Sequence, residues 1–177
     1  MSAEALLLTY RVNAIGPTLV LQAFAPLLRA TAAASAARGG GAPPRVANVS
    51  ARVSSIRENR LGGWHAYRAS KAALNMLTKT AAVELAQGGP PVICLLLHPG
   101  TVATDLSRPF NRNGAQRAPQ VHACACTADA PTAPRAVPAK MLFTPETAVR
   151  CMLNVIGGAT AADSGKLISW DGAPIDW

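Results

Sequence analysis

Tyr67 and Lys71 are four residues apart in the sequence, and together they could form an acid/base pair. At 3.6 residues per turn, this spacing places both side chains on one face of a helix, about 40° apart. A phenol in water keeps its proton up to about pH 10. Because a neighbouring ammonium favours the phenolate, we expect Lys71 to lower the pKa of Tyr67 and make it useful in general acid/base work. In isolation, such a pair is typical of a surface lysine beside a packing tyrosine.

The pair belongs to a longer motif, Tyr67-Arg-Ala-Ser-Lys71-Ala-Ala, which resembles the active-site helix of the short-chain dehydrogenases/reductases. The sequence from Trp170 to Trp177 resembles the carbonyl-reductase-like branch of that family, close to the C-signal and sniffer proteins. The resemblance implies an α/β fold with a Rossmann-like, doubly wound parallel sheet. It also implies an NAD(P)-dependent oxidoreductase that reduces carbonyls or oxidises alcohols by hydride transfer.

By this resemblance, Tyr67 protonates the carbonyl oxygen, while Lys71 lowers the pKa of Tyr67 and binds the ribose of NAD or NADP. Asn13 matches an asparagine that positions a proton-relay water near the lysine. Asn13 lies shortly before Pro17, which removes an amide donor and is expected to kink a long helix. A hydrogen bond from Asn13 to the kinked backbone is the simpler alternative.

The loop that follows the apolar run Val92–Leu97 resembles the family's loop at the nicotinamide end of the cofactor. The resemblance implies that the backbone at Val102 binds the carboxamide and that the hydroxyl of Thr104 binds the diphosphate. Pro99 fixes the turn, and Gly100 allows the backbone to approach the cofactor closely. The sequence does not distinguish NAD from NADP.

The resemblance also implies a serine at the end of the strand predicted at 45–50, where it orients the substrate carbonyl. The family often has two consecutive serines there, the second catalytic, but this chain has Ser50-Ala51. Ala51 cannot donate a hydrogen bond, so another serine takes the role or the role is lost. Because side chains alternate along a strand, Ser50 is expected to face away from position 51. We therefore favour Ser55, with Ser50 as the second candidate.

Hydrophobic periodicity and capping residues predict the elements that position these side chains. The expected order is a helix at 3–36 with a kink near Pro17 and irregularity near Pro26, a strand at 45–50, a polar loop at 51–63, the helix of Tyr67 at about 65–87, a buried parallel strand at 92–97, a helix from Pro145 to 157–158 capped by Thr144, and a last strand and turn at 163–172.

The length predicts a single domain over residues 1–177. Within it, residues 30–44 are predicted to form a flexible turn, because Gly39-Gly-Gly41 and Pro43-Pro44 end an alanine-rich helix. Residues 114–139 have no period and are rich in alanine and proline, which indicates a disordered insertion. A metal site at Cys124-Ala-Cys126 is the less favoured alternative, since that spacing is too short for a zinc knuckle.

The resemblance covers only the C-terminal part of the family's fold. A dinucleotide-binding fold opens with a strand, a glycine-rich turn and a helix whose N-terminus binds the pyrophosphate. The sequence has no such glycine motif, so we expect the N-terminal βαβ units to be missing and the truncated chain to be inactive alone. The alternative function is a non-catalytic remnant that pairs with a full-length relative through its helices. A homodimer through the same helices is a further candidate.

Composition limits the expected partners. The formal net charge of +8 comes largely from scattered arginines, without the basic stripe or interleaved aromatic residues of nucleic-acid binders. No run reaches the roughly 18 apolar residues of a membrane span, and residues 1–4 lack a basic signal region. The four cysteines show no disulfide framework. We therefore expect a cytoplasmic protein that acts on a small carbonyl or alcohol, with no metal, nucleic-acid or membrane partner.

Overall fold

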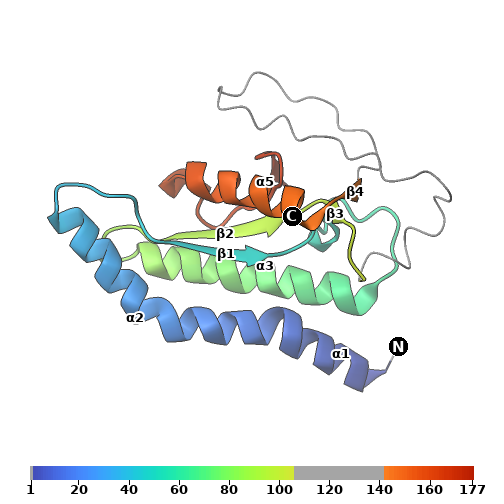
Figure 1. Cartoon of the computed structure of the whole chain (residues 1–177). Helices are drawn as coiled ribbons and strands as arrows, with labels where there is room; N and C mark the ends of the chain where they lie inside the picture. Colours follow the sequence, from blue (N-terminus) through green and yellow to red (C-terminus); the bar gives the residue numbers. More distant parts are fainter. Residues whose placement is uncertain (1, 106–141) are drawn as a thin grey trace.

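The computed structural model describes residues 2–105 and 142–177, which form a sheet with helices on both of its faces (Figure 1). The helices are α1 (Ala3–Tyr10), the π-helical turn η1 (Arg11–Ile15), α2 (Gly16–Ala37), the 3₁₀ turn η2 (Arg52–Ser54), α3 (His65–Ala86), α5 (Pro145–Gly158) and the 3₁₀ turn η4 (Ala161–Asp163). The strands are β1 (Arg45–Val49), β2 (Ile93–His98), β3 (Thr101–Val102), β4 (Leu142–Phe143), β5 (Leu167–Ser169) and β6 (Pro174–Ile175).

The main sheet has the order β1-β2-β5-β6. β1, β2 and β5 are parallel, with Val49 opposite Leu97 and His98 opposite Ser169, whereas β6 is antiparallel to β5. Parallel neighbours need long crossover connections, which α3 provides between β1 and β2. The carboxyl ends of β1 and β2 therefore lie at one edge of the sheet, where open α/β sheets bind ligands.

β2 lies at the centre of the core, and its side chains pack on both faces of the sheet. Ile93, Leu95 and Leu97 belong to the cluster that α5 covers. Cys94 and Leu96 pack in the clusters formed with α2 and α3 on the opposite face. All five are at most 2% exposed. Because full burial of one large aliphatic side chain contributes about 1.5–3 kcal/mol, this strand is a main source of stability.

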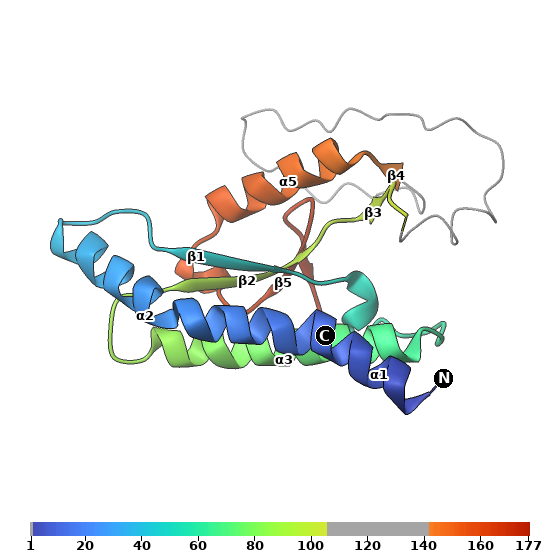
Figure 2. The ribbon, with the colours of Figure 1, turned by 60° about the horizontal axis from the view of Figure 1, so that its bottom comes forward.

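α1, η1 and α2 form one continuous helical stretch alongside α3 (Figure 2). The π-helical turn η1 ends just before Gly16-Pro17. Pro17 has no N–H to donate to the carbonyl of Asn13, four residues earlier, so the ordinary helical ladder is interrupted there. The kink predicted near Pro17 is therefore a local π turn. The irregularity predicted near Pro26 does not interrupt α2, which continues to Ala37.

The other predicted elements lie within a few residues of their expected bounds. The hydroxyl of Thr144 accepts from the N–H of Thr147 over 3.2 Å, as expected of an N-cap. The alanines of the predicted turn at 30–44 extend α2 as far as Ala37, so the turn begins after it. Sequence patterns did not predict β6 or the pairing of β3 with β4. The predicted insertion at 114–139 lies outside the described residues.

The stretch Ala3–Ala37 is long and apolar enough to cross a membrane, judged by length and composition alone. This is weak evidence, because core helices and signal sequences share these properties. In the fold, the stretch packs on α3. Several of its large apolar side chains are nevertheless exposed, namely Leu7, Leu8, Val12, Ile15, Leu19, Val20, Phe24 and Leu27.

Candidate active site

A cavity of about 630 Å³ lies at the carboxyl ends of β1 and β2. It brings together segments that are far apart in the sequence, from η1, the end of β1, the start of α3, the loop after β2, and α5. The lining residues are Asn13, Val49, Ser50, Ala51, Val53, Trp64, Tyr67, Lys71, His98, Pro99, Gly100, Thr101, Val102, Thr104, Pro145, Ala148, Val149 and Met152.

Tyr67 and Lys71 lie in the first two turns of α3, and both line this cavity. Lys71 Nζ donates a hydrogen bond to the carbonyl oxygen of Val49, over 2.8 Å. The same nitrogen lies 5.9 Å from the centre of the Tyr67 ring. The helix therefore places a phenol and an ammonium side by side against the end of β1.

Burial controls the protonation of both groups. Loss of hydration disfavours each charged form, so it raises the pKa of Tyr67 and lowers the pKa of Lys71. The net lowering of the pKa that was predicted for Tyr67 is not found, because burial raises the pKa of this phenol. Tyr67 consequently keeps its proton at neutral pH, which is the form that a general acid needs.

Asn13 lines the cavity from the π turn, on the side of α3. Its Nδ2 donates to the hydroxyl of Ser70 over 3.0 Å, and that hydroxyl donates to the carbonyl of Tyr67 over 2.9 Å. The hydrogen bond of Asn13 thus goes to a side chain of α3 rather than to the kinked backbone. This contact ties the π turn to the helix that carries the acid/base pair.

The loop after β2 places Pro99, Gly100, Val102 and Thr104 along the cavity, as predicted. Gly100 has a φ of +78°, a conformation that favours glycine. A Cβ at Gly100 would lie 2.6 Å from the ring of Phe143, so packing within the protein requires the glycine. The close approach to a cofactor that was expected of Gly100 is not needed to explain this residue.

Ser50 and Ser54, which follow β1, and Asn75 of α3 are buried and form a chain of hydrogen bonds with one direction. Ser54 Oγ donates to the carbonyl of Ala51 over 2.6 Å, so it can only accept from Asn75 Nδ2, 2.7 Å away. Asn75 Oδ1 then faces Ser50 and accepts its hydroxyl hydrogen over 2.6 Å. Because a backbone carbonyl only accepts, it fixes the direction of every bond in the chain. Ser50 lines the cavity, yet its hydrogen points to Asn75.

Ser55, the serine favoured from the sequence, does not line the cavity. It donates to the carbonyl of Asp176 and accepts from the N–H of Glu58, so it holds the loop to the C-terminal segment. Strand alternation misled the prediction because β1 ends at Val49 and the chain turns into η2. Ser50 and Ala51 both reach the cavity as a result. On placement, Ser50 replaces Ser55 as the candidate.

His98 and Trp64 also line the cavity, although the sequence analysis did not assign them to the site. Burial, with a smaller contribution from Arg52, lowers the pKa of His98 to about 4. Its Nδ1 is buried and has no hydrogen-bond partner among the described residues. His98 ends β2 directly before the loop Pro99–Thr104, which is a position that the sequence pattern could have indicated. Within residues 2–105 and 142–177, no cluster of His, Cys, Asp and Glu could hold a metal ion.

The family model of short chain dehydrogenases matches residues 1–115. The C-signal protein of Myxococcus xanthus is 33% identical over 169 residues, which cover 96% of this chain and 76% of C-signal. This chain belongs to the short-chain dehydrogenase/reductase family.

Other members of the family are longer than the matched region. The 1-hydroxy-2-glutathionyl-2-methyl-3-butene dehydrogenase of Rhodococcus sp. is 31% identical over 166 residues, and the match covers 56% of that protein. Two solved carbonyl reductases share the fold, the NADPH-bound enzyme from chicken fatty liver (28% identity, TM-score 0.72) and Sniffer of D. melanogaster (27%, 0.73). In both cases all of this chain matches 59% of the other chain. The chain thus spans little more than half the length of these three relatives.

Proposed function

We propose that this chain provides the catalytic and nicotinamide-side part of an NAD(P)-dependent oxidoreductase that acts on small carbonyls or alcohols. One observation supports the proposal above the others: Tyr67, Lys71 and the loop Pro99–Thr104 line one cavity at the carboxyl ends of two parallel strands. The carbonyl reductases of similar fold support the same class of reaction.

In the reductive direction, Tyr67 donates its hydroxyl proton to the carbonyl oxygen of the substrate. Its raised pKa keeps the proton available at neutral pH. Lys71, held by the carbonyl of Val49, places a positive charge beside the ring and stabilises the phenolate that remains. Asn13, which contacts α3 through Ser70, positions the water that returns a proton to Tyr67.

NAD or NADP, when bound, supplies or accepts the hydride. The donor set fits the nicotinamide end of either cofactor: Lys71 and Tyr67 would hold the ribose, while Val102 and Thr104 would hold the carboxamide and the first phosphate. Gly100 keeps this loop in a tight turn against Phe143, so its backbone is already ordered. The chicken carbonyl reductase is bound to NADPH, which makes NADPH the first cofactor to test.

The exposed apolar residues of α2 and α3 support a second candidate, pairing through these helices with a second copy or with a longer relative. Leu19 and Phe24 on α2 are 57% and 55% exposed, and Met76 and Val83 on α3 are 67% and 48% exposed. Exposed apolar residues are typical of contact surfaces where they form one patch. Sedimentation of the purified chain tests the pairing, which Phe24→Glu should weaken.

A cytoplasmic location remains a prediction.

Turnover of a ketone tests the catalytic proposal. The purified chain is mixed with acetophenone and either NADPH or reduced nicotinamide mononucleotide, and loss of the dihydronicotinamide absorbance is followed. Tyr67→Phe should lower the rate by about 100-fold or more, the scale of general acid catalysis. Tyr10→Phe is the matched control, because Tyr10 does not line the cavity. Where wild type shows measurable turnover, an equal rate for Tyr67→Phe would remove Tyr67 from the mechanism.

A further inference from the structure

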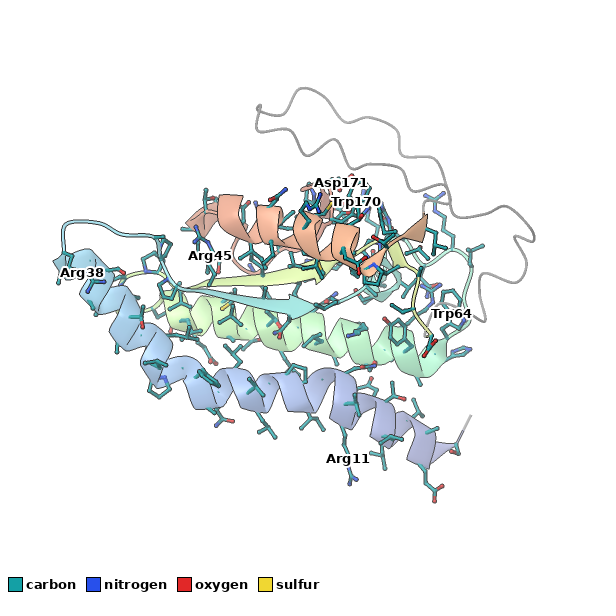
Figure 3. The ribbon with its side chains drawn as sticks, in the orientation of Figure 1. Arg11, Arg38, Arg45, Trp64, Trp170 and Asp171 are labelled. Atoms are coloured by element: carbon teal, nitrogen blue, oxygen red, sulfur yellow. The ribbon has the colours of Figure 1, made fainter. Side chains whose placement is uncertain are left out.

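Apolar side chains line the cavity from the N-terminal end of α3, which carries Tyr67, and from the loop after β1, which packs on α3. Trp64 lies one turn before Tyr67 at the N-terminal end of α3 (Figure 3), and Ala51 and Val53 come from the loop after β1. α5 contributes Pro145, Ala148, Val149 and Met152. A ligand in this cavity therefore has apolar side chains available from α3, from the loop after β1 and from α5, and one of them is an indole ring.

Trp64 has an unusual backbone conformation. Its φ of 50° and ψ of 40° lie in the left-handed region, and no other described residue except glycines has a positive φ. Residues with a Cβ are disfavoured in that region. Such conformations persist where the surrounding structure enforces them, and they cluster at functional sites. The indole, 50% exposed, is thus held at the cavity by a conformation that glycine would adopt more readily.

Arg68, on α3, contacts both the loop after β1 and the ring of Trp64. Its guanidinium donates to the carbonyls of Val53, Gly62 and Gly63 at 3.0–3.1 Å. The same group lies 5.6 Å from the centre of the Trp64 ring, within the range of a cation–π contact. One side chain therefore fixes both the loop that carries Val53 and the ring of Trp64.

Among the described residues, few polar side chains at this end of the cavity can hydrogen-bond a ligand. Ala51 has no donor, and the hydroxyl hydrogen of Ser50 is directed to Asn75. Among the described lining residues, Lys71 alone carries a charge at neutral pH, and it donates to Val49. A substrate with a carboxylate or several hydroxyls would lose hydration here without replacement hydrogen bonds, which is costly.

We propose that Trp64 selects the substrate and favours uncharged ketones or aldehydes whose carbonyl carries a flat, aromatic group. This deepens the proposed function and rests on it. The aromatic ring of the substrate lies against the indole, while the carbonyl oxygen reaches the hydroxyl of Tyr67. Aromatic pairs gain beyond their buried area, so a planar ring binds more tightly than a saturated ring of the same size.

Binding to the 177-residue chain tests the proposal without any hydride transfer. Three methyl ketones are compared by titration of amide NMR spectra: acetophenone, its saturated analogue cyclohexyl methyl ketone, and the charged 4-acetylbenzoate. Ketones avoid the imine that an aldehyde would form with Lys71. Acetophenone should bind about 5-fold or more tightly than either analogue and shift the amides of residues 51–53 and 64–67.

Trp64→Gly is the decisive variant, since glycine accepts the backbone conformation and preserves or improves folding. It should weaken acetophenone binding about 5-fold or more and abolish the preference over cyclohexyl methyl ketone. Trp177→Ala is the control, because Trp177 does not line the cavity. A purely structural role of Trp64 would change the melting temperature and leave the preference intact.

Equal binding of acetophenone to wild type and Trp64→Gly, equal binding of the three ketones, or no binding of any ketone would overturn the selection by Trp64. Tyr67→Phe should keep the binding preference. If acetophenone binds as expected but Tyr67→Phe reduces a ketone as fast as wild type, the proposed function fails while the binding site stands. If other carbonyls are reduced but the ketone preference is absent, the selection alone fails.

Discussion

Lys71 and Val49 are joined by a hydrogen bond of 2.8 Å, from the ammonium to the last carbonyl of β1. This bond ties the second turn of α3 to the end of the strand and sets where the positive charge lies. The ammonium is 5.9 Å from the centre of the Tyr67 ring. The sheet therefore positions the charge, while burial sets the pKa of the phenol, and the two effects can be separated by experiment.

The first prediction concerns the ionisation of Tyr67. In Tyr10→Phe, Tyr67 is the sole tyrosine, and an absorbance titration should show it ionising above pH ~10 because burial raises its pKa. A raised pKa contributes stability that is present below the unfolded value and lost as the pH rises through the folded value. Tyr67→Phe should therefore lose less stability than wild type above pH ~10. Ionisation below pH ~9 would mean that Lys71 outweighs burial.

The second prediction concerns His98, whose pKa is lowered to about 4 by burial. The unfolded chain protonates this histidine near its ordinary value of about 6.5. Its contribution to stability is thus present above pH ~6.5 and is lost as the pH falls toward the folded pKa. Thermal unfolding should show a falling melting temperature over this range in wild type and a smaller fall in His98→Leu. If the melting temperatures of wild type and His98→Leu fall equally with pH, protonation of His98 does not destabilise the fold.

The sequence predicted the parts of the site that local spacing determines. Tyr67 and Lys71 lie four residues apart on one helix, so their common face follows from helix geometry alone. The buried strand followed from its uninterrupted apolar residues, which suit a strand covered on both faces. The loop Pro99–Thr104 lies next to both because the carboxyl ends of parallel strands meet at one edge.

Contacts between distant segments were not predictable in the same way. The choice of Ser55 assumed that strand geometry continues past position 50, whereas β1 ends at Val49. The role of Asn75 depends on two serines more than 20 residues away in the sequence. The left-handed conformation of Trp64 was also hidden, because sequence rules assign that conformation to glycine.

The third prediction concerns Gly100 and uses Gly88 as a matched control. Both have a φ above +70°, but a Cβ at Gly88 would meet nothing within 4 Å, whereas one at Gly100 would meet Phe143 at 2.6 Å. Gly88→Ala should therefore show the cost of the backbone conformation alone. Gly100→Ala should cost a further 1–3 kcal/mol, roughly, from overpacking, as measured by denaturant unfolding. Equal costs would show that Phe143 moves aside freely.

The fourth prediction ranks the positions around the end of β1 by ketone turnover. Ser50→Ala should lower the rate more than Ser55→Ala, because Ser50 lines the cavity and holds Asn75 by a hydrogen bond, whereas Ser55 binds Asp176. This reverses the ranking expected from strand alternation. Ala51→Ser should raise the rate, since it adds a donor where Ser50 offers none. A larger loss in Ser55→Ala would contradict the placement of Ser50 at the cavity, and no gain in Ala51→Ser would contradict the direction of the bond from Ser50 to Asn75.

The last prediction concerns the cofactor. The loop Pro99–Thr104, Tyr67 and Lys71 are the candidate contacts, and all of them are assigned to the nicotinamide end. Tight dinucleotide binding depends on a pyrophosphate seat at a helix N-terminus that follows a glycine-rich turn, and the sequence has no such glycine motif. The 177-residue chain should therefore bind NADPH no more than about 3-fold more tightly than reduced nicotinamide mononucleotide, and neither should saturate at ~0.1 mM by calorimetry. Lys71→Met should weaken both ligands equally, because both carry the same nicotinamide ribose. If NADPH binds 10-fold or more tightly than the mononucleotide (about 1.4 kcal/mol), the chain has an adenosine or pyrophosphate site that the described residues do not indicate.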